Sequence, residues 1–346
     1  SDPGGYFIVD GKEKVIVSQE KFADNMLYIR GNYSDVYNYS AEIRSVSEDS
    51  SKPVRTTAVR IVSDRPTLAN GQMVVVIPNV RSPIPLFIVM RALGLDSDKE
   101  IVEYCLLNLD KNSTLVELFV PSVHDAGVIF TQALALKYIS TFTKAKTVPA
   151  VLDILANYFL PHIGELNMRA KAYFLGYMVF KMLKVSTGLE QPTARDSYKY
   201  KRMELSGNLL RSLFTEHYTL QHKHLTQAID KKYFYHVGTY QQNFPSLFTD
   251  NYVEFFKERI VESGFKKAFK GNWGAEVHTK RPGVLQDLNR LTFNSAISQL
   301  RKTNLPLDSS TKVRGPRLLD GTQWGIIDPV DSPDGGNVGL HNHLAI

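Results

Sequence analysis

Three aspartates near the end of the chain are the residues whose type and spacing best suit chemistry. Asp328, Asp331 and Asp334 recur every three residues among prolines and glycines. Carboxylate oxygens are the ligands that hard divalent cations prefer. Aspartate is also frequent in turns, because its side chain accepts hydrogen bonds from its own downstream amides. The spacing therefore leaves two interpretations open, a cation site and a structural turn.

Histidines occur in two patterns that could indicate a metal site or a nuclease, and both patterns are weak. Four of them could suggest a metal site, namely His217, His222, His224 and His236. No cysteine or carboxylate stands beside them at the spacing of a tetrahedral zinc site, so we expect surface histidines on a polar helix. The string His341-Asn342-His343 is similar to a nuclease signature, but it lacks the glycine-rich context that such a signature needs.

A block of positive charge precedes the aspartates. Residues 264–317 contain eleven Lys or Arg and three acidic residues, a net charge of +8 against +6 for the whole chain. Residues 318–340 reverse the sign, with four aspartates and no Lys or Arg. Placed along one groove, the basic block would bind phosphates of any sequence by releasing their counterions. Charge alone fits a solvated basic face equally well.

The elements that must position these charges begin with two loops, residues 271–283 and 306–316, which are rich in Gly, Pro and positive charge. The run between them has apolar residues at helical spacing, namely Val284, Leu285, Leu288, Leu291, Ile297 and Leu300. This pattern predicts two loops on a helical base. Such loops can approach a polymer closely, because Gly has no Cβ and Pro loses little conformational freedom.

The composition predicts a folded chain that has no membrane-spanning segment. Its 346 residues, 43% of them hydrophobic, suffice for two or three domains with a large core. The most apolar stretch, residues 172–183, is too short to cross a bilayer and contains Lys181. Cys105 is the only cysteine, which rules out an internal disulfide, and its amphipathic surroundings predict a buried thiol. We therefore expect a soluble protein.

Strand patterns precede helical ones along the chain. Asp10-Gly11 predicts a tight hairpin turn between residues 6–9 and 14–17. Further strands are expected at residues 41–46, 56–62 and 72–77. Helical patterns then predominate, at residues 86–93, 101–109, 115–119, 132–139, 150–160 and 166–185. Together they indicate the α+β class.

Two local signals mark boundaries in the helical part. Ser97 and Glu100 form a capping box before the run at 101–109. Residues 186–193, with a Gly and a Pro, are typical of a linker, and four cations follow at once: Arg195, Lys199, Lys201 and Arg202. This basic box fits a surface that faces nucleic acid, and it also fits a solvated helix start.

Several strings carry a resemblance that composition could not show. They are DPGGYFIVDGKEKVIVSQE (2–20), RALGL (91–95), FLPHIG (159–164), FLGYM (174–178), RDSYKYKRMELSG (195–207), GNWG (271–274), RPGVLQDLNR (281–290), SQLRKTNLP (298–306) and GPRLLDGTQWGIIDPVDSPDGGNVGL (315–340). In this order they resemble the N-terminal half of the second-largest, beta-type subunit of multisubunit DNA-dependent RNA polymerases. DPGGYF and FLPHIG are most similar to eukaryotic and large-DNA-virus members.

The resemblance implies an architecture in which a lobe interrupts a protrusion. Residues 1–55 and 199–270 would form the two parts of a protrusion of mixed sheet and helix, which pack together. Residues 56–198 would form a separate, mostly helical lobe. Residues 271–346 would form a loop-rich fork region, truncated at its C-terminus, so the chain is expected to be a fragment.

The family implies that the chain walls the nucleic-acid cleft and guides downstream DNA and the RNA–DNA hybrid. Residues 307–317 correspond to the fork loop near downstream DNA, and Arg301-Lys302 to a basic pair beside the hybrid. The implied nucleic-acid-binding residues are Lys199, Lys201, Arg202, Lys270, Lys280, Arg281, Gln299, Arg301, Lys302, Lys312, Arg314 and Arg317. Phosphate contacts of this kind position the strands and read no sequence.

Asp331, Asp334 and Asn337 would lie near the active site by the same resemblance. The family's turn ordinarily reads Glu-Thr-Pro-Glu-Gly, and here both carboxylates are one methylene shorter. In the family, the Mg²⁺ ions of nucleotide transfer are held by an Asp triad of the largest subunit. This chain contains no Asp-Phe-Asp-Gly-Asp run. We therefore expect no catalytic residue, no metal and no bound cofactor in it.

The implied partners are the largest subunit, the other polymerase subunits, the DNA template and the RNA–DNA hybrid, with initiation factors on the lobe and protrusion and no membrane. The implied location is the nucleus, or host cytoplasm and virion for a viral protein. A second class of function also fits the charge. A self-contained single-strand-binding or nuclease-like protein would show salt-sensitive binding or cleavage by the isolated chain.

Overall fold

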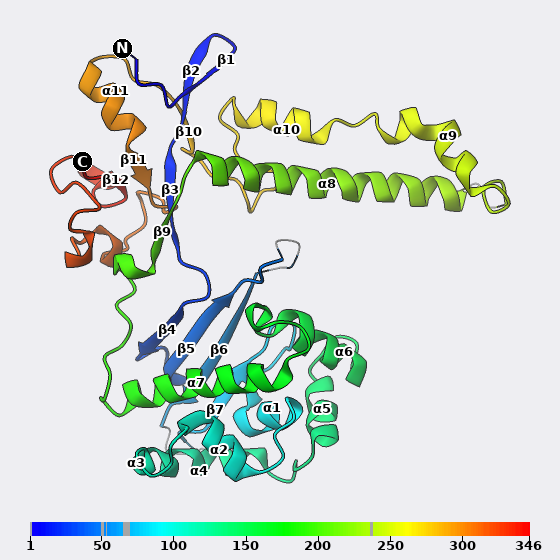
Figure 1. Ribbon diagram of the computed structural model, residues 1–346, viewed down its shortest axis with the longest axis vertical. Coiled ribbons are helices and arrows are strands. Elements are labelled where there is room, and N and C mark those ends of the chain that lie inside the picture. Colours follow the sequence, from blue (N-terminus) through cyan, green and yellow to red (C-terminus); the bar gives the residue numbers. More distant parts are fainter. Residues whose placement is uncertain (1, 50–51, 53, 65–69, 236–237) are drawn as a thin grey trace. The chain divides into compact units, whose positions relative to one another are not determined.

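The computed structural model describes residues 2–49, 52, 54–64, 70–235 and 238–346. Its internal contacts divide the chain into two compact units. Unit 1 comprises Ser1–Phe22 and Asp196–Ile346, and unit 2 comprises Ala23–Arg195. Figure 1 shows helices and several separate sheets, which confirms the predicted α+β class.

Unit 2 contains a five-stranded antiparallel sheet. Its spatial order is β4 (Leu27–Gly31), β5 (Tyr37–Ser45), β6 (Arg55–Val62), β7 (Met73–Val76) and β8 (Ile84–Pro85). Strands β5 and β6 pair from Tyr37↔Val62 to Ser45↔Arg55. The domain boundary expected between residues 55 and 56 would separate these two partners. The compact unit instead begins at Ala23.

Unit 2 also contains helices. They are α1 (Leu86–Ala92), α2 (Asp98–Leu106), α3 (Ser113–Val116), α4 (Val120–Ala126), α5 (Gln132–Ser140), α6 (Val148–Asp153) and α7 (Met168–Ser186). Of these helices, α1, α4 and α7 pack on its sheet. Short turns of 3-10 helix lie at Glu117–Phe119 and Pro161–Ile163. The predicted helices at 86–93, 132–139 and 166–185 are confirmed. Ser97 accepts a hydrogen bond from the Glu100 amide at 3.1 Å, which confirms this half of the predicted capping box. The Glu100 carboxylate accepts from the Asp96 amide at 3.3 Å instead of from the Ser97 amide.

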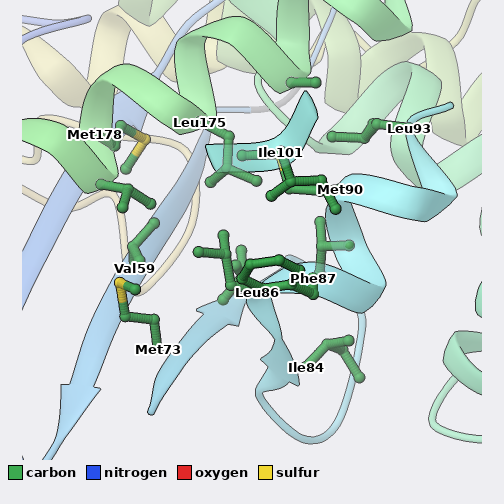
Figure 2. Close-up of a cluster of buried hydrophobic side chains, with 14 of the residues drawn as sticks. Val59, Met73, Ile84, Leu86, Phe87, Met90, Leu93, Ile101, Leu175 and Met178 are labelled. Atoms are coloured by element: carbon green, nitrogen blue, oxygen red, sulfur yellow. The ribbon is translucent and has the colours of Figure 1, made fainter. Parts of the chain in front are cut away.

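The core of unit 2 lies between the sheet and helices α1, α2 and α7. Figure 2 shows Met73 from the sheet, Phe87 from α1 and Leu175 from α7 in one cluster, and all three are fully buried. Each such side chain contributes about 1.5–3 kcal/mol by leaving water. Helices α2 and α7 approach closely at Gly176, where a Cβ would lie 2.5 Å from the Tyr104 carbonyl oxygen.

The predicted helix at residues 150–160 changes character midway. α6 ends at Asp153, and a π-helical turn, η2, follows at Ile154–Tyr158. The ammonium group of Lys171 on α7 is fully buried and donates to the carbonyl oxygens of Leu155, Ala156 and Phe159 at 2.6–2.8 Å. This side chain satisfies the carbonyl groups that the end of the helical segment leaves without partners.

Unit 1 is organised around its N-terminal strands. The hairpin of β1 (Phe7–Val9) and β2 (Lys12–Ile16) confirms the predicted turn, with positive φ angles of 51° at Asp10 and 74° at Gly11. After Val17, the chain continues as β3 (Ser18–Phe22). One sheet has the order β1, β2, β10 (Leu285–Asp287), and the other has β12 (His341–His343), β11 (Lys302–Asn304), β3, β9 (Lys201–Glu204). Strand β2 therefore lies between β1 and β10, and β3 lies between β11 and β9.

The helix predicted across residues 284–300 is wrong in its first half. Residues Leu285–Asp287 form β10, which pairs antiparallel with β2 and places Leu285 opposite Ile16. Helix α11 begins only at Phe293, after a capping box between Thr292 and Ser295. The apolar spacing was compatible with a helix, but the free edge of β2 gives this segment a strand partner.

A helical arm completes unit 1. It consists of the 30-residue α8 (Ser206–Tyr235), α9 (Phe244–Phe255) and α10 (Ile260–Ala268), and Figure 1 shows α9 and α10 returning beside α8. At its base, Ile16 packs with Leu209 and Leu213 of α8. Among the described residues, no helix has both the length and the apolarity to cross a membrane.

The histidines of the arm differ from the expected surface set. His217 is only 6% exposed, and its ring packs against Gly264 of α10, where a Cβ would lie 2.3 Å from the ring. Burial lowers the pKa of His217. His222 is exposed, His224 contacts the Glu258 carboxylate at 3.0 Å, and His236 lies outside the described residues.

Candidate nucleic-acid interface

The turn that contains the three aspartates is fixed by its own hydrogen bonds. One carboxylate oxygen of Asp328 accepts from the amides of Val330 at 2.9 Å and Asp331 at 3.3 Å. These bonds hold the pKa of Asp328 below its usual range. Among the described residues, no group of three or more His, Cys, Asp or Glu side chains could hold a metal ion. The structural interpretation of the aspartate pattern is therefore the one that the geometry supports.

Asp331 joins this turn to two neighbouring elements. Its carboxylate accepts from the Ser298 hydroxyl of α11 at 2.7 Å and lies 3.4 Å from the ring nitrogen Nδ1 of His343 on β12. The same ring nitrogen contacts the Asp331 carbonyl oxygen at 2.8 Å. Asp334 is exposed and Asn337 is half-buried beside it in a 3-10 turn. Sequence reasoning missed the link through Ser298, because the two residues are far apart in the chain.

The string His341-Asn342-His343 is strand β12. It pairs antiparallel with β11, with Lys302 opposite His343 and Asn304 opposite His341. Burial, followed by the nearby ammonium of Lys302, lowers the pKa of His341. The string thus supplies a sheet edge beside Lys302 rather than a cluster of metal ligands.

Arg317, one of the predicted phosphate contacts, is bound by the protein itself. Its guanidinium donates to the carbonyl oxygens of Gly336 and Val338 on one side, at 2.5 and 3.1 Å. On the other side it donates to those of Ser309 and Thr311, at 2.9 and 3.3 Å. Arg317 therefore ties the loop at 306–316 to the segment that follows the aspartate turn.

Lys201 also pairs with groups of the protein itself. It is buried on β9, where its ammonium lies 3.0 Å from the Glu20 carboxylate of β3 and 4.0 Å from the centre of the Phe22 ring. The Tyr198 hydroxyl donates to the other oxygen of Glu20 at 2.9 Å. Burial, followed by that carboxylate, raises the pKa of Tyr198. This enclosed network joins β3 to β9 and removes Lys201 from the cations that can face a ligand.

Three more predicted contacts have internal partners. Arg281 lies 3.1 Å from the Glu204 carboxylate. Arg301 donates to the carbonyl oxygens of Leu344 and Ala345. The Gln299 side chain accepts from the Asn289 amide at 2.6 Å and donates to the Asp287 carbonyl oxygen at 2.9 Å, which fixes α11 beside the end of β10. These side chains shape the region, and their polar groups are largely occupied.

The remaining predicted cations are available to a ligand. Lys199, Lys270, Lys280, Lys312 and Arg314 are exposed, and Lys302 is half-buried on β11. Within the part of the chain that the structure describes, none of these six pairs with a carboxylate. Arg202 is exposed too, although its guanidinium donates to the carbonyl oxygens of Lys199 and Lys201. The available cations therefore lie in turns and loops of unit 1 and on the inner strand β11, whereas the internal ones join its loops and strands.

Two family models match the chain. They are "RNA polymerase Rpb2, domain 2" over residues 50–204 and "RNA polymerase Rpb2, domain 3" over residues 286–346. The chain belongs to the family of Rpb2-type, second-largest subunits of DNA-directed RNA polymerases. The resemblance seen in the sequence strings is thereby confirmed.

The curated relatives that match include eukaryotic and archaeal proteins. DNA-directed RNA polymerase II subunit RPB2 of Encephalitozoon cuniculi is 37% identical over all of this chain and 30% of its own length. DNA-directed RNA polymerase II subunit 2 of Arabidopsis thaliana is 35% identical, over 100% of this chain and 29% of that protein. DNA-directed RNA polymerase subunit Rpo2 of Saccharolobus shibatae is 33% identical, with the same coverages. The chain thus spans less than a third of these relatives.

Proposed function

We propose that the chain walls the nucleic-acid cleft of a DNA-directed RNA polymerase and guides downstream DNA and the RNA–DNA hybrid. Its partners would be the largest and the other polymerase subunits, with initiation factors on the lobe and protrusion. Its location would be the nucleus, or host cytoplasm and virion for a viral protein. The observation that carries the proposal is the division of the basic residues into internal cations and available ones.

This division supports a guiding role because the internal cations fix the backbone and the exposed cations can bind phosphates. Arg317 and Arg301 tie loop and strand backbones together by donating to carbonyl oxygens. Lys312 and Arg314 project from the loop that Arg317 holds, and both are exposed. A fixed loop with free cations can bind phosphates along a strand without reading its bases.

The chain itself is proposed to supply no metal-binding group for nucleotide transfer. The carboxylate of Asp328 is occupied by amides, and that of Asp331 by Ser298. Two-metal catalysis needs carboxylates directed at both ions, whereas at least one oxygen of each of these two carboxylates is already bound within the protein. Mg²⁺ would be held by the largest subunit.

The test is a double substitution, Lys312→Ala with Arg314→Ala, in the complete polymerase. Each lost phosphate contact should reduce the slope of log affinity against log salt by up to ~0.9 on duplex DNA, so the pair by up to ~1.8. The lifetime of the open or elongation complex should shorten. Assembly of the subunit should not change, because exposed charges contribute little to folding.

The matched control is Lys223→Ala with Lys231→Ala, two exposed lysines on α8 of the same unit. It removes the same net charge and should leave the salt slope and the complex lifetime as they are. If the loop variant and the control behave alike, the cations at 312 and 314 only solubilise the surface, and the guiding role is refuted. Arg317 is kept intact in both variants, because its loss would also change the loop.

A further inference from the structure

The outer side of α9 consists of exposed aromatic side chains. Phe244, Phe248, Tyr252 and Phe256 follow at four-residue spacing and are 52%, 39%, 60% and 63% exposed. Residues four apart lie on one side of a helix, so the rings form a continuous stripe. Val253, which is 67% exposed, widens the stripe. We call these five residues the aromatic face.

The inner side of α9 already has its partner. Leu247 and Phe255 are buried with Tyr240 in a cluster that includes residues of α8. The Asn251 side chain donates to the Tyr240 hydroxyl at 3.1 Å and to the Leu247 carbonyl oxygen at 2.9 Å. These contacts hold α9 on the arm, together with the ring of Phe244, which lies 6.0 Å from that of Tyr233 on α8, and the ring of Phe248, which lies 6.2 Å from that of Phe255. The rest of the aromatic face, Tyr252, Val253 and Phe256, keeps more than half of each side chain exposed.

The charges around the aromatic face indicate what can cover it. The face has no charged side chain, while its flanks carry charges of both signs, including Asp250 and Lys257. Glu254 on the flank is already paired with Lys232 at 2.9 Å. Nucleic acid and anionic membranes both need a surplus of cations, which this side of α9 does not offer. An uncharged aromatic centre with a mixed polar rim matches the anatomy of a protein–protein interface.

The size of the aromatic face agrees with this interpretation. An aromatic side chain buries ~150–250 Å², so four rings exposed by about half offer roughly 400 Å². The largest apolar patch on a typical monomer is ~300–600 Å² and is often functional. A partner in a standard interface contributes about 800 Å², half of which the aromatic face would supply. The polar flanks can provide the rest as a rim.

We propose that the aromatic face binds an apolar helix of another protein in the polymerase assembly, with Tyr252 and Phe256 as its anchors. Aromatic residues are enriched among those that carry most of an interface's binding energy. A helix with aliphatic residues at i, i+4 and i+7 can place them along the row of rings. Within unit 1, α9 lies at the far part of the arm from β9 (Figure 1). The inference rests on the proposed function only in locating the partner within the polymerase.

The test is site-specific photocrosslinking in the assembled polymerase. A benzophenone amino acid replaces Tyr252 in one sample and, as matched control, Lys257 on the charged flank in another. The Tyr252 position should crosslink to one other protein chain, identified by mass spectrometry, at a yield ~10-fold above the Lys257 position. Crosslinks to nucleic acid, to added anionic vesicles or to a second copy of this chain would overturn the proposal, and so would equal yields at both positions.

Substitution gives an independent measurement. Tyr252→Glu with Phe256→Glu should weaken binding of the crosslinked partner ~30-fold or more, as expected for interface anchors. The control Asp250→Lys with Lys257→Glu exchanges charges on the flank of the same segment and should change it less than threefold. Unchanged partner affinity in the first variant, with an unchanged thermal unfolding midpoint, overturns the proposal. The salt slope measured with the 312 and 314 variant is a separate readout, so the two proposals fail independently.

Discussion

Replacing Arg317 with Ala should loosen the loop at residues 306–316 without removing a phosphate contact. The guanidinium makes four hydrogen bonds to carbonyl oxygens of two segments. A net hydrogen bond contributes ~0.5–1.5 kcal/mol, and we take the low end because Arg317 is half-exposed, which gives about 2 kcal/mol for the set. The backbones meet closely here, since a Cβ on Gly339 would lie 2.4 Å from the Arg317 Cα.

Hydrogen exchange of the backbone amides measures this loss directly. A loss of about 2 kcal/mol in local opening corresponds to roughly 30-fold faster exchange. We expect this acceleration in peptides that cover residues 305–318 and 334–341. The control Arg314→Ala removes an exposed guanidinium from the same loop and should change exchange less than twofold. Equal exchange in the two variants would refute the structural role assigned to Arg317.

Two further predictions follow from the buried histidine and from the occupied carboxylates. His217 should make the arm sensitive to acid, because burial lowers the pKa of its ring in the folded chain. Its contribution to the free energy of unfolding is present above about pH 6.5, the pKa of an unperturbed histidine, and is lost as the pH falls below that value. The loss is ~1.4 kcal/mol for each unit by which the folded pKa lies below the unfolded one. Thermal unfolding at pH 7.5 and 5.5 should show a smaller difference for His217→Phe than for the unsubstituted chain, and an equal difference would contradict the assignment. The isolated chain should not extend a primer in the presence of Mg²⁺, because its described residues form no two-metal centre. Template-dependent extension by the highly purified chain would disprove this.

Local signals in the sequence predicted the elements that depend on a few neighbouring residues. The hairpin at Asp10-Gly11 needs two positive φ angles, and the residue types reveal them. The cap at Ser97 depends on one side chain and one amide three residues later. The family strings, which extend over the whole chain, predicted the family itself.

Interactions between distant segments could not be read from residue type. Lys201 and Arg317 look like phosphate-binding residues in the sequence, yet the partner of the first is Glu20 on another strand, and the partners of the second are backbone carbonyl groups. The spacing of Leu285 fits a helical pattern, but its segment pairs with the edge of β2 as a strand. His217 was expected at the surface, but its ring is buried against Gly264, which has no side chain to block it. In each case the deciding neighbour is distant in the chain, and neither composition nor periodicity identifies it.

The pairing of β3 with β9 has a consequence for how the chain can fold. Phe22 lies opposite Lys201, so the two ends of the segment that forms unit 2 must meet before this part of the sheet can close. An unfolded segment of that length makes the meeting improbable, and each doubling of a loop costs ~0.6 kcal/mol in entropy. Once unit 2 has folded around its own core, its two ends are no longer connected by a long unfolded chain. Early folding of unit 2 therefore favours the pairing of β3, which precedes it in the sequence, with β9, which follows it.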